Sequence, residues 1–187
     1  MAVNQIISNF ITVASQKDFA RDNLFRVMAF NTRVLQLDET DLIYCKGADI
    51  PGRSTPTSQV QYGGMKLNYN QSTVEYTSSD NYQLKFYLDA NGDLRKKFEE
   101  ANRLIFNDIS NTGNWRFPST EDVITIAQLG FNMEPIKFYH LYGVTIKDIQ
   151  PITTNAAEGQ GVAIEVVLTI SFLYYRTEGS DIIYSEQ

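Results

Sequence analysis

Hydrophobic and polar residues alternate along most of this chain with a period of two, which is the pattern of β-strands that bury one face. Residues 23–30 are apolar on both faces apart from Arg26, which favours a strand covered on both sides. Gly63 and Gly64 interrupt one alternating run and predict either a β-bulge or a tight turn. The expected strands cover residues 23–30, 42–46, 60–62, 65–69, 73–77, 82–88, 123–129, 136–149 and 162–175.

Two segments show helical spacing instead. Apolar residues at intervals of three and four within residues 3–14 predict a short N-terminal helix. A second series of apolar residues runs from Leu94 to Ile109 at the same intervals, with charged residues on the opposite face. Asp93 is the expected N-cap of this interior helix, so we expect it to begin there and to lie with one side against a sheet.

Many strands and one interior helix predict a mainly β fold, an antiparallel β-sandwich or barrel that the helix covers. A chain of 187 residues is the size of one domain and can bury a core without disulfides or metal ions. We expect a single domain over residues 1–187, with an N-terminal helix or arm over 1–16 and a C-terminal arm over 177–187. Residues 51–58 are rich in Gly, Ser, Thr and Pro and predict a loop.

The charge of the chain restricts its partners. The 16 basic and 22 acidic side chains leave a net charge of −6 and a pI of about 4.8. An acidic chain is a poor candidate for gripping phosphates, which argues against tight nucleic-acid binding. The N-terminal segment has no basic region typical of a signal peptide, and no run approaches the ~18–20 apolar residues of a membrane span. We therefore expect a soluble protein made in a cytoplasm, without a membrane partner.

Few residues suggest chemistry. Cys45 lies in an apolar run and is expected to be a small buried thiol, and His140 is the single histidine. The acid pairs Glu99–Glu100 and Glu121–Asp122 are interpreted as solvent-exposed charges. No Gly-x-Ser-x-Gly motif accompanies His140. We expect no catalytic residues, no metal site and no cofactor.

The most specific stretch of the sequence runs from Lys17 to Val27 and reads Lys-Asp-Phe-Ala-Arg-Asp-Asn-Leu-Phe-Arg-Val. It resembles the N-terminal Asp-Phe-Ala-Arg-x-Asn-Leu-Phe-x-Val segment of tail tube proteins from contractile-tailed bacteriophages. The order of later elements is similar too: a short strand that ends before Pro51, a polar loop, paired strands, a helix with Phe and basic residues, and long closing strands with terminal tyrosines. The resemblance spans about residues 10–176, whereas the 153–161 loop and the 177–187 tail depart from the family pattern.

This resemblance implies a structural subunit without catalytic residues. In the family, subunits form hexameric rings that stack into the inner tail tube within a contractile sheath, and double-stranded DNA passes through without tight binding. A tape measure protein in the lumen, and a baseplate initiator and a tail terminator at the ends, are the further partners implied. The protein is accordingly expected in the virion tail, and in the host cytoplasm during assembly.

Three alternatives remain open from the sequence. The same fold occurs in type VI secretion inner tubes and in baseplate tube initiators. Initiators are usually longer, so 187 residues favour the repeating subunit. The strand count and the 12% aromatic content also fit a β-barrel that binds a small ligand.

Two regions are candidate assembly sites. In the first, Phe19 and Phe25 are expected to anchor the start of the first strand, while Asp18 and Arg21 pair or bond backbone groups, either inside the fold or between rings. The second is the loop at 51–59 with the strand at 60–69. A long polar loop cannot pack a core of its own, so we expect it to reach another subunit. Its candidate contact residues are Arg53, Thr55, Pro56 and Thr57.

The net charge also leads to an expectation for an assembled tube. A channel lined by acidic side chains repels phosphates and lets DNA slide. We therefore expect a net negative lumen.

Overall fold

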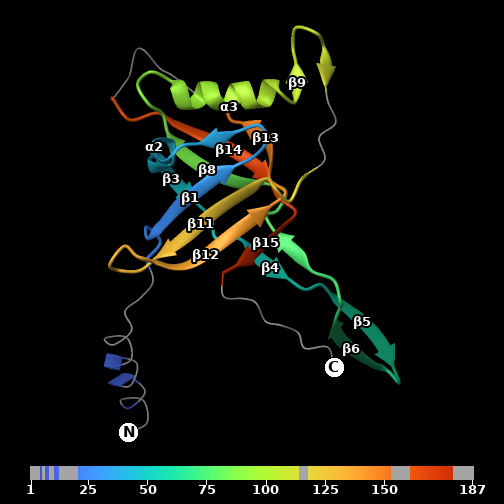
Figure 1. Ribbon diagram of the computed structural model, residues 1–187. Coiled ribbons are helices and arrows are strands. Elements are labelled where there is room, and N and C mark those ends of the chain that lie inside the picture. The colour runs from blue at the N-terminus through green and yellow to red at the C-terminus, as the bar shows by residue number, and fades with distance from the viewer. Residues whose placement is uncertain are drawn as a thin grey trace.

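The structure is a computed structural model, and it describes residues 5, 7, 8, 11, 12, 21–113, 118–152 and 161–178. Short antiparallel strands are the predominant elements among these residues (Figure 1). The elements are β1 (Phe25–Asn31), β2 (Gln36–Leu37), α2 (Glu39–Ile43), β3 (Cys45–Ala48), β4 (Gly52–Ser54), β5 (Thr57–Tyr62), β6 (Met65–Asn70), β7 (Glu75–Thr77), β8 (Tyr82–Tyr87), α3 (Asp93–Arg103), β9 (Phe106–Asn107), β10 (Thr112–Gly113), β11 (Val123–Leu129), β12 (Pro135–Tyr142), β13 (Thr145–Ile149), β14 (Glu165–Ser171) and β15 (Tyr174–Thr177).

Two sheets form the body of the molecule. The five-stranded sheet has the order β15-β12-β11-β1-β2, and the four-stranded sheet has the order β13-β14-β8-β3. Every strand pairing in both sheets is antiparallel. Three further pairs, β4-β7, β5-β6 and β9-β10, stand as two-stranded sheets. The mainly β fold expected from the sequence is therefore confirmed, and the described strands form an open sandwich instead of a closed barrel.

The core lies between the two sheets. The five-stranded sheet contributes Phe30 and Ile124, the four-stranded sheet contributes Leu84 and Phe86, and all four side chains are fully buried. On α3, the buried Phe98 packs against Phe86 with ring centroids 5.4 Å apart. The helix thus closes one end of the sandwich, as its apolar face predicts.

The two longest expected strands are each split between the sheets. Residues 136–149 contain β12 of the five-stranded sheet and β13 of the four-stranded sheet, and residues 162–175 contain β14 and β15 in the same way. The first break falls at Gly143, whose φ of +71° a residue with a side chain adopts only with strain. The second break lies beside it, because the N–H of Leu173 donates to the carbonyl of Tyr142 at 2.9 Å. The prediction of single strands was wrong here because alternation continues across the corner.

The corner at Gly143 leaves no room for a side chain. A Cβ atom on this residue would lie 2.6 Å from the side chain of Leu173. We expect Gly143→Ala to lower the free energy of unfolding by about 2 kcal/mol, because left-handed strain adds to this close contact. Gly47→Ala is the matched control, since its Cβ would meet neighbours at ordinary distances of 3.6 Å and beyond. Thermal unfolding of both variants checks this, and equal losses in Tm would contradict it.

The prediction of a strand over residues 42–46 was wrong for the first half of that range. Residues 39–43 form α2, and Cys45 begins β3. The helix starts behind Asp38, whose carbonyl accepts the N–H of Leu42 at 3.0 Å, and the carboxylate of Asp41 accepts the N–H of Asp38 at 3.2 Å. The cap from Asp41 and this first helical bond outweigh the apolar pattern that suggested a strand.

The interior helix is confirmed, but both of its ends differ from the prediction. Gly92 is the N-cap, with φ of +73°, and Asp93 is the first helical residue. The carboxylate of Asp89 accepts the N–H groups of Asp93 and Leu94 at 3.0 and 3.1 Å. These bonds lower the pKa of Asp89. The helix ends at Arg103, so Ile109 lies outside it.

Two further predictions, the double-sided cover of β1 and the terminal arms, can be compared with the structure. β1 is not covered on both faces, because Arg26 and Met28 are exposed and the register shifts between Val27 and Ala29. The N-terminal helix or arm over 1–16 lies largely outside the described residues, of which Ile7 and Ile11 are helical and exposed. Of the C-terminal arm, only residues 177 and 178 are described.

Candidate assembly surfaces

The strands β5 and β6 form a hairpin that projects away from the sandwich (Figure 1). We refer to residues 55–74, which contain this hairpin, as the arm. The turn of the hairpin is Gly63-Gly64, with φ of +55° and +82°. Positive φ at both central residues is the geometry of a two-residue hairpin turn, so the double glycine is a turn and not a bulge.

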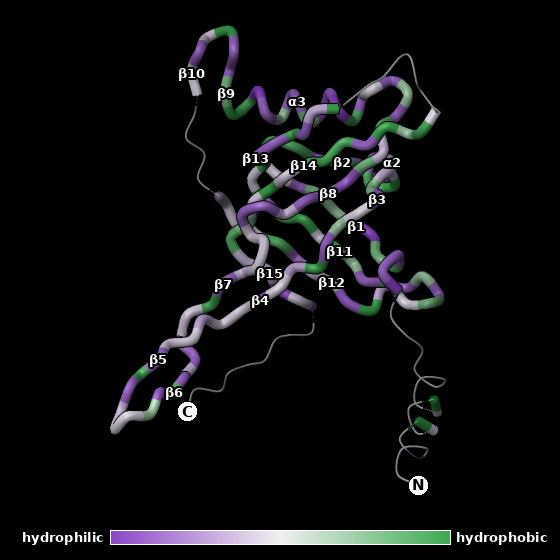
Figure 2. The backbone as a smooth tube through the Cα atoms, turned by 180° about the vertical axis from the view of Figure 1, so that it is seen from behind, coloured by the Kyte–Doolittle hydropathy of each residue, from purple (hydrophilic) through white to green (hydrophobic). Residues whose placement is uncertain are grey.

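The arm has one apolar face. Side chains directly opposite in an antiparallel pair share a face, and the register places Val60 opposite Leu67 and Tyr62 opposite Met65. Figure 2 shows the resulting alternation of hydrophobic and hydrophilic residues along both strands. Together the apolar positions are Val60, Tyr62, Met65, Leu67 and Tyr69.

None of the residues that the structure describes covers this face completely. Its five side chains are between 45% and 76% exposed. A two-stranded hairpin is at best marginally stable in water, and a contiguous exposed apolar face marks a surface that binds another molecule. The arm therefore has the composition of an interface and not of a solvent-exposed loop.

The opposite face of the arm is polar. Gln59 lies opposite Asn68, and its amide nitrogen donates to the Asn68 side-chain oxygen at 3.1 Å. Gln61 lies opposite Lys66 on the same face. In a packed sheet, alternation with a period of two places one face of a strand in the core. In this hairpin the same alternation produces one apolar face and one polar face.

The base of the arm is fixed to the body. β4 and β7 pair below the hairpin, and the N–H of Gln71 donates to the carbonyl of Pro56 at 2.8 Å. Tyr76 on β7 meets the ring of Tyr175 on β15 edge to face, with centroids 5.4 Å apart. The arm consequently projects from the β15 edge of the five-stranded sheet in a defined direction.

A second exposed apolar group lies at the other end of the molecule, where β9 and β10 follow α3 (Figures 1 and 2). Leu104, Phe106 and Ile109 are 47% to 95% exposed, although the sequence placed Ile109 on the buried face of the helix. The side chain of Asn107 accepts the N–H groups of Ile109 and Ser110 at 2.9 and 3.2 Å. This turn holds Ile109 outward. We refer to Leu104, Phe106, Asp108 and Ile109 as the helix tip.

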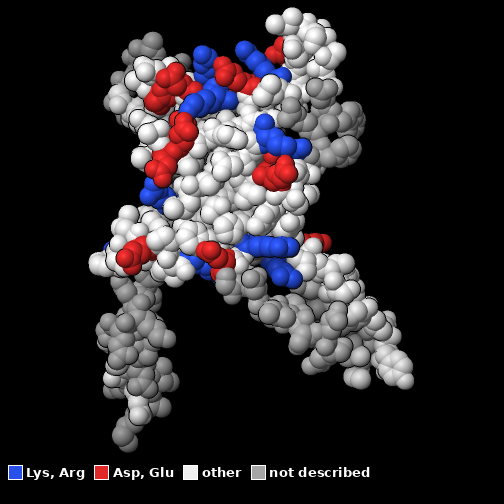
Figure 3. All heavy atoms as spheres, in the orientation of Figure 1, with Lys and Arg blue, Asp and Glu red and all other residues white. Residues whose placement is uncertain are grey.

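The two ends differ in charge. Residues 38–44 and 89–109, which include α2 and α3, carry eight acidic and four basic side chains. Charged groups crowd this end of the face shown in Figure 3. Residues 52–74, which contain the arm, carry Arg53 and Lys66 and no acidic residue. The helix end is thus net negative and the arm is net positive.

No protein-family model matches the sequence, and no curated protein matches it significantly. Solved structures do match. A chain in the cryo-EM structure of the anti-feeding prophage baseplate superposes with a TM-score of 0.60 at 14% identity, over 89% of this chain and 99% of that chain. A chain in the sheath/tube terminator structure of an extracellular contractile injection system gives 0.56 at 10% identity, over 87% and 98%. The sheath-tube complex of such a system gives 0.51 at 9% identity, over 89% and 96%.

The chain has a phage tail tube-like fold. At these identities the likeness is one of fold, and it extends over most of each chain compared. The structures that share the tail tube-like fold with this chain are components of contractile injection systems: baseplate, terminator and sheath-tube complex.

Within the tail tube-like fold, the second predicted region becomes a coherent surface. Arg53 lies in β4 opposite Tyr76, Thr57 begins β5, and Pro56 bonds to Gln71. Thr55 lies between β4 and β5 and is exposed. All four residues lie at the base of the arm. The prediction of a loop over residues 51–58 was wrong, because β4 and β5 occupy most of them and pair with β7 and β6. The apolar face beyond the base was recognised only as alternation.

The first predicted region is less complete. Asp18 and Phe19 lie outside the described residues. The guanidinium of Arg21 lies 5.0 Å from the ring centroid of Phe131, in cation–π geometry. Phe25 begins β1 opposite Gln128 and is half-buried, outside the hydrophobic core. The structure thus gives Arg21 and Phe25 separate neighbours.

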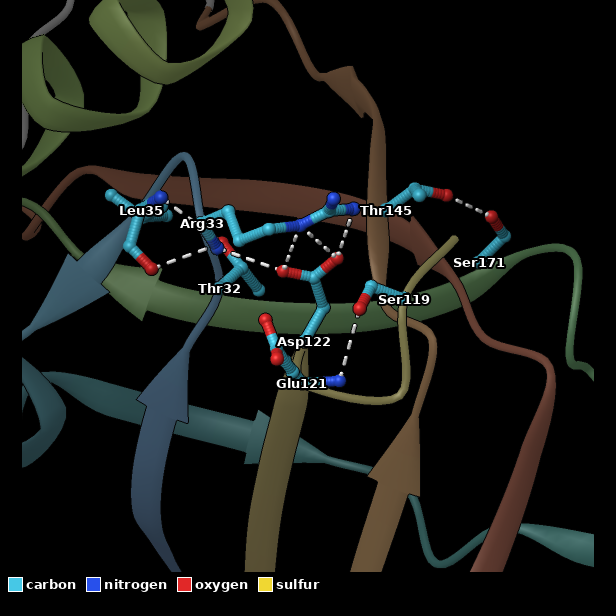
Figure 4. A network of polar contacts seen from close by, with 8 residues as sticks. All are labelled: Thr32, Arg33, Leu35, Ser119, Glu121, Asp122, Thr145 and Ser171. Carbon is cyan, nitrogen blue, oxygen red and sulfur yellow. Dashed lines mark hydrogen bonds and ion pairs between the residues drawn. The ribbon is translucent and has the colours of Figure 1, made fainter. Parts of the chain in front are cut away.

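A buried ion pair fixes the start of β11 within the tail tube-like fold (Figure 4). The side chain of Asp122 is 5% exposed and that of Arg33 is 46% exposed. The Asp122 carboxylate accepts the backbone N–H of Arg33 at 2.7 Å and its Nη2 at 2.9 Å, and Nε lies 3.2 and 3.3 Å from the two oxygens. The interpretation of Glu121–Asp122 as an exposed pair was therefore wrong for Asp122.

The same residue also holds the corner between the sheets. The carbonyl of Asp122 accepts the N–H groups of Gly143 and Val144 at 2.9 and 3.2 Å. Burial acts to raise the pKa of Asp122, but the bonds from Arg33 outweigh it, so the pKa lies below its usual value. Asp122 thus joins the β1–β2 turn to the crossing from β12 to β13, which is a structural role.

The single histidine and the single cysteine both have structural neighbours. The Nδ1 atom of His140 lies 3.0 Å from Thr125 Oγ1, and its ring stacks on Phe138 with centroids 6.3 Å apart. Cys45 is half-buried, and burial raises the pKa of its thiol to about 12. Among the described residues, no three His, Cys, Asp or Glu side chains converge as a metal site, and no helix is long and apolar enough to cross a membrane.

Proposed function

We propose that the chain is the repeating subunit of a contractile phage tail tube. Six copies close into a ring, and rings stack into the inner tube that conducts double-stranded DNA to the host. In this proposal the sheath protein surrounds the tube, a tape measure protein lies in the lumen, and a baseplate initiator and a tail terminator occupy the ends. The subunit has no enzymatic role, and it acts in the virion tail after assembly in the host cytoplasm.

The observation that carries the proposal is the arm on a tail tube-like fold. A monomer gains little from a hairpin whose apolar face the described residues leave largely exposed. A subunit that repeats along a tube has a neighbour available at every position to cover it. The tyrosines of the arm suit an interface, because they bury a ring while their hydroxyl group still forms hydrogen bonds.

The expected passage of DNA depends on the lumen. The outward face of the four-stranded sheet carries Lys46, Lys85 and Glu165, with Lys46 paired to Glu165. That of the five-stranded sheet carries Arg176 over the rings of Tyr142 and Tyr174. Neither face is a dense basic surface, which agrees with weak binding to phosphates. Neither is rich in acids, so a negative lumen needs acids from other parts of the chain.

Purified protein tests the proposal directly. Analytical ultracentrifugation over a concentration series is expected to show hexamers or larger species, and negative-stain microscopy is expected to show rings and open-ended tubes. A chain that stays monomeric at high concentration after prolonged incubation contradicts the proposed function.

A baseplate tube initiator is the second candidate. The match to the anti-feeding prophage baseplate has a higher TM-score, 0.60, than the match to the sheath-tube complex, 0.51. An initiator forms a ring that does not stack on itself, whereas a tube subunit grows without limit. The same micrographs therefore separate the two: single rings alone favour the initiator, and long tubes favour the tube subunit.

A further inference from the structure

The arm and the helix tip, two of the exposed apolar groups among the described residues, lie at opposite ends of the subunit (Figures 1 and 2). The arm projects from one end, and the helix tip lies at the other. Identical copies that associate through two different surfaces form a closed ring or an open stack, and each contact covers one surface of either kind. A second copy of the chain is therefore an occupant that accounts for both groups at once.

We propose that the apolar face of the arm docks on the helix tip of a second copy. This inference rests on the proposed function, since it names the surface that receives the arm. Val60, Leu67 and Met65 then pack against Leu104, Phe106 and Ile109 of the neighbour.

The helix tip has the shape and the lining that such a contact needs. Two hollows of about 420 and 290 Å³ adjoin there, and both are lined by Arg103 and Asp108. Leu104 and Ile109 line the larger one, and Phe106 lines the smaller one. Each is large enough for the side chains of a β-strand. The fully exposed Ile109 fits the role of a side chain that a partner covers.

Charge complements the apolar match. Lys66 lies near the tip of the arm on its polar face, and the arm has no acidic residue. The receiving end is net negative, and Asp108 lies next to Ile109. The C-terminus of α3 ends at Arg103 and adds the negative end of its helix dipole there. Lys66 lies on the face of the arm opposite Leu67, and Arg103 lines both hollows beside Asp108, so the charges attract the arm to this end over a distance and form no direct ion pair there.

Phe131, Met133 and Ile136, near the turn between β11 and β12, are 64% to 74% exposed and form one competing receptor. The outward face of the five-stranded sheet is another. It is aromatic, but its rings already pack on one another: Tyr142 and Tyr174 stack with centroids 5.1 Å apart, and Arg176 lies over both. Its aromatic residues are half-buried, whereas Ile109 is 95% exposed. A partner can therefore bury more exposed apolar surface at the helix tip than on this sheet face.

Site-directed crosslinking tests the contact in assembled protein. One tagged copy carries Leu67→Cys and a differently tagged copy carries Ile109→Cys, both with Cys45→Ser so that no native thiol reacts. A short bismaleimide is expected to join the two tags in the mixture, and to do so several-fold better than when Asn31→Cys on the five-stranded sheet replaces Ile109→Cys. Equal or better crosslinking to Asn31→Cys overturns the proposal.

Charge reversal gives an independent test. We expect Lys66→Glu to raise the concentration needed for assembly by about two- to fivefold, because it gives the arm the same sign of charge as the net negative end that receives it. Adding Asp108→Lys to the same chain is expected to restore part of the loss, because the receiving end is then less negative. Lys85→Glu on the outward face of the four-stranded sheet makes the same change in charge and is the control. A double variant that assembles worse than Lys66→Glu alone overturns the proposal.

These outcomes distinguish the two levels of inference. Rings and tubes whose arms crosslink elsewhere contradict only the docking of the arm on the helix tip. A chain that never assembles contradicts the proposed function, and the docking contact with it.

Discussion

A chain in which Asn-Gly replaces residues 55–74 is expected to fold normally and to remain unassembled. The replacement joins Ser54 to Glu75, which already lie opposite each other in the β4–β7 pair, through a two-residue turn. No residue between 55 and 74 belongs to the hydrophobic core. The free energy of unfolding should therefore change by about 1 kcal/mol or less.

The loss of assembly follows from the apolar face that this variant lacks. Burial of a large apolar side chain contributes about 1.5–3 kcal/mol, and five such residues line the face. A milder variant, Val60→Ser with Leu67→Ser, should weaken association by about 2 kcal/mol or more, which is about 30-fold in concentration. Sedimentation velocity and negative-stain microscopy measure this effect.

The arm offers its own control. Gln59→Ser with Asn68→Ser changes an equivalent cross-strand pair on the polar face. We expect this variant to assemble close to the wild-type concentration. If both double variants fail equally, the arm matters through its conformation and not through its apolar face. If the armless chain forms tubes at the wild-type concentration, the assembly role of the arm is refuted.

The second prediction with a large expected effect concerns the ion pair of Arg33 and Asp122. The two side chains differ in burial, so removing one is not equivalent to removing the other. Arg33→Met leaves a carboxylate buried without its cation, and we expect a loss of about 3–5 kcal/mol in the free energy of unfolding. Asp122→Asn leaves a half-exposed guanidinium that water can solvate, and its oxygen can still accept the backbone N–H of Arg33. That variant should lose only about 1–2 kcal/mol.

The effect of Asp122 on the free energy of unfolding should change with pH in opposite directions in the native chain and in Arg33→Met. In the native chain the pKa of Asp122 lies below its unfolded value, so its contribution is present above that value and is lost as the pH falls through the folded pKa. Without the Arg33 side chain, the pKa of Asp122 rises, because backbone N–H groups alone then oppose the effect of burial, and protonation relieves part of the cost. The stability difference between native and Arg33→Met chains should therefore shrink between about pH 7 and about pH 4.

Urea unfolding at both pH values measures this difference, because titrations elsewhere in the chain cancel between the two proteins. Glu121→Gln, a neutralisation at the exposed neighbouring residue, is the control and should change stability by about 0.5 kcal/mol or less. Equal losses for Arg33→Met and Asp122→Asn, without a pH trend, would show that the buried charge is not the cause.

Local patterns predicted most of the strands, but not how they join. The alternation at 65–69 identified β6, yet the same pattern fits a strand in a core and a hairpin in solvent. Only the three-dimensional arrangement shows that none of the described residues forms a second layer over it. Residues 136–149 illustrate the converse problem, because one glycine moves the chain to another sheet without disturbing the alternation.

The parts of the candidate site that lie close together in the sequence were predictable, and the parts formed by residues far apart were not. The base of the arm was found because Pro, Gly, Ser and Thr cluster within a few residues. The ion pair joins residues 89 positions apart, and nothing local distinguishes Asp122 from its exposed neighbour Glu121. Ile109 continued the helical spacing of α3 and was misassigned, because the turn after Arg103 has no glycine or proline to reveal it.

The position of the arm and the helix tip at opposite ends gives the subunit polarity. A stack of such subunits, joined as proposed, ends in uncovered arms on one side and uncovered helix tips on the other. The two ends are chemically distinct, so a protein that starts growth must present one surface and a protein that stops growth must present the other. Elongation from a starter would then proceed in a single direction, with its rate set by whichever surface the growing end displays.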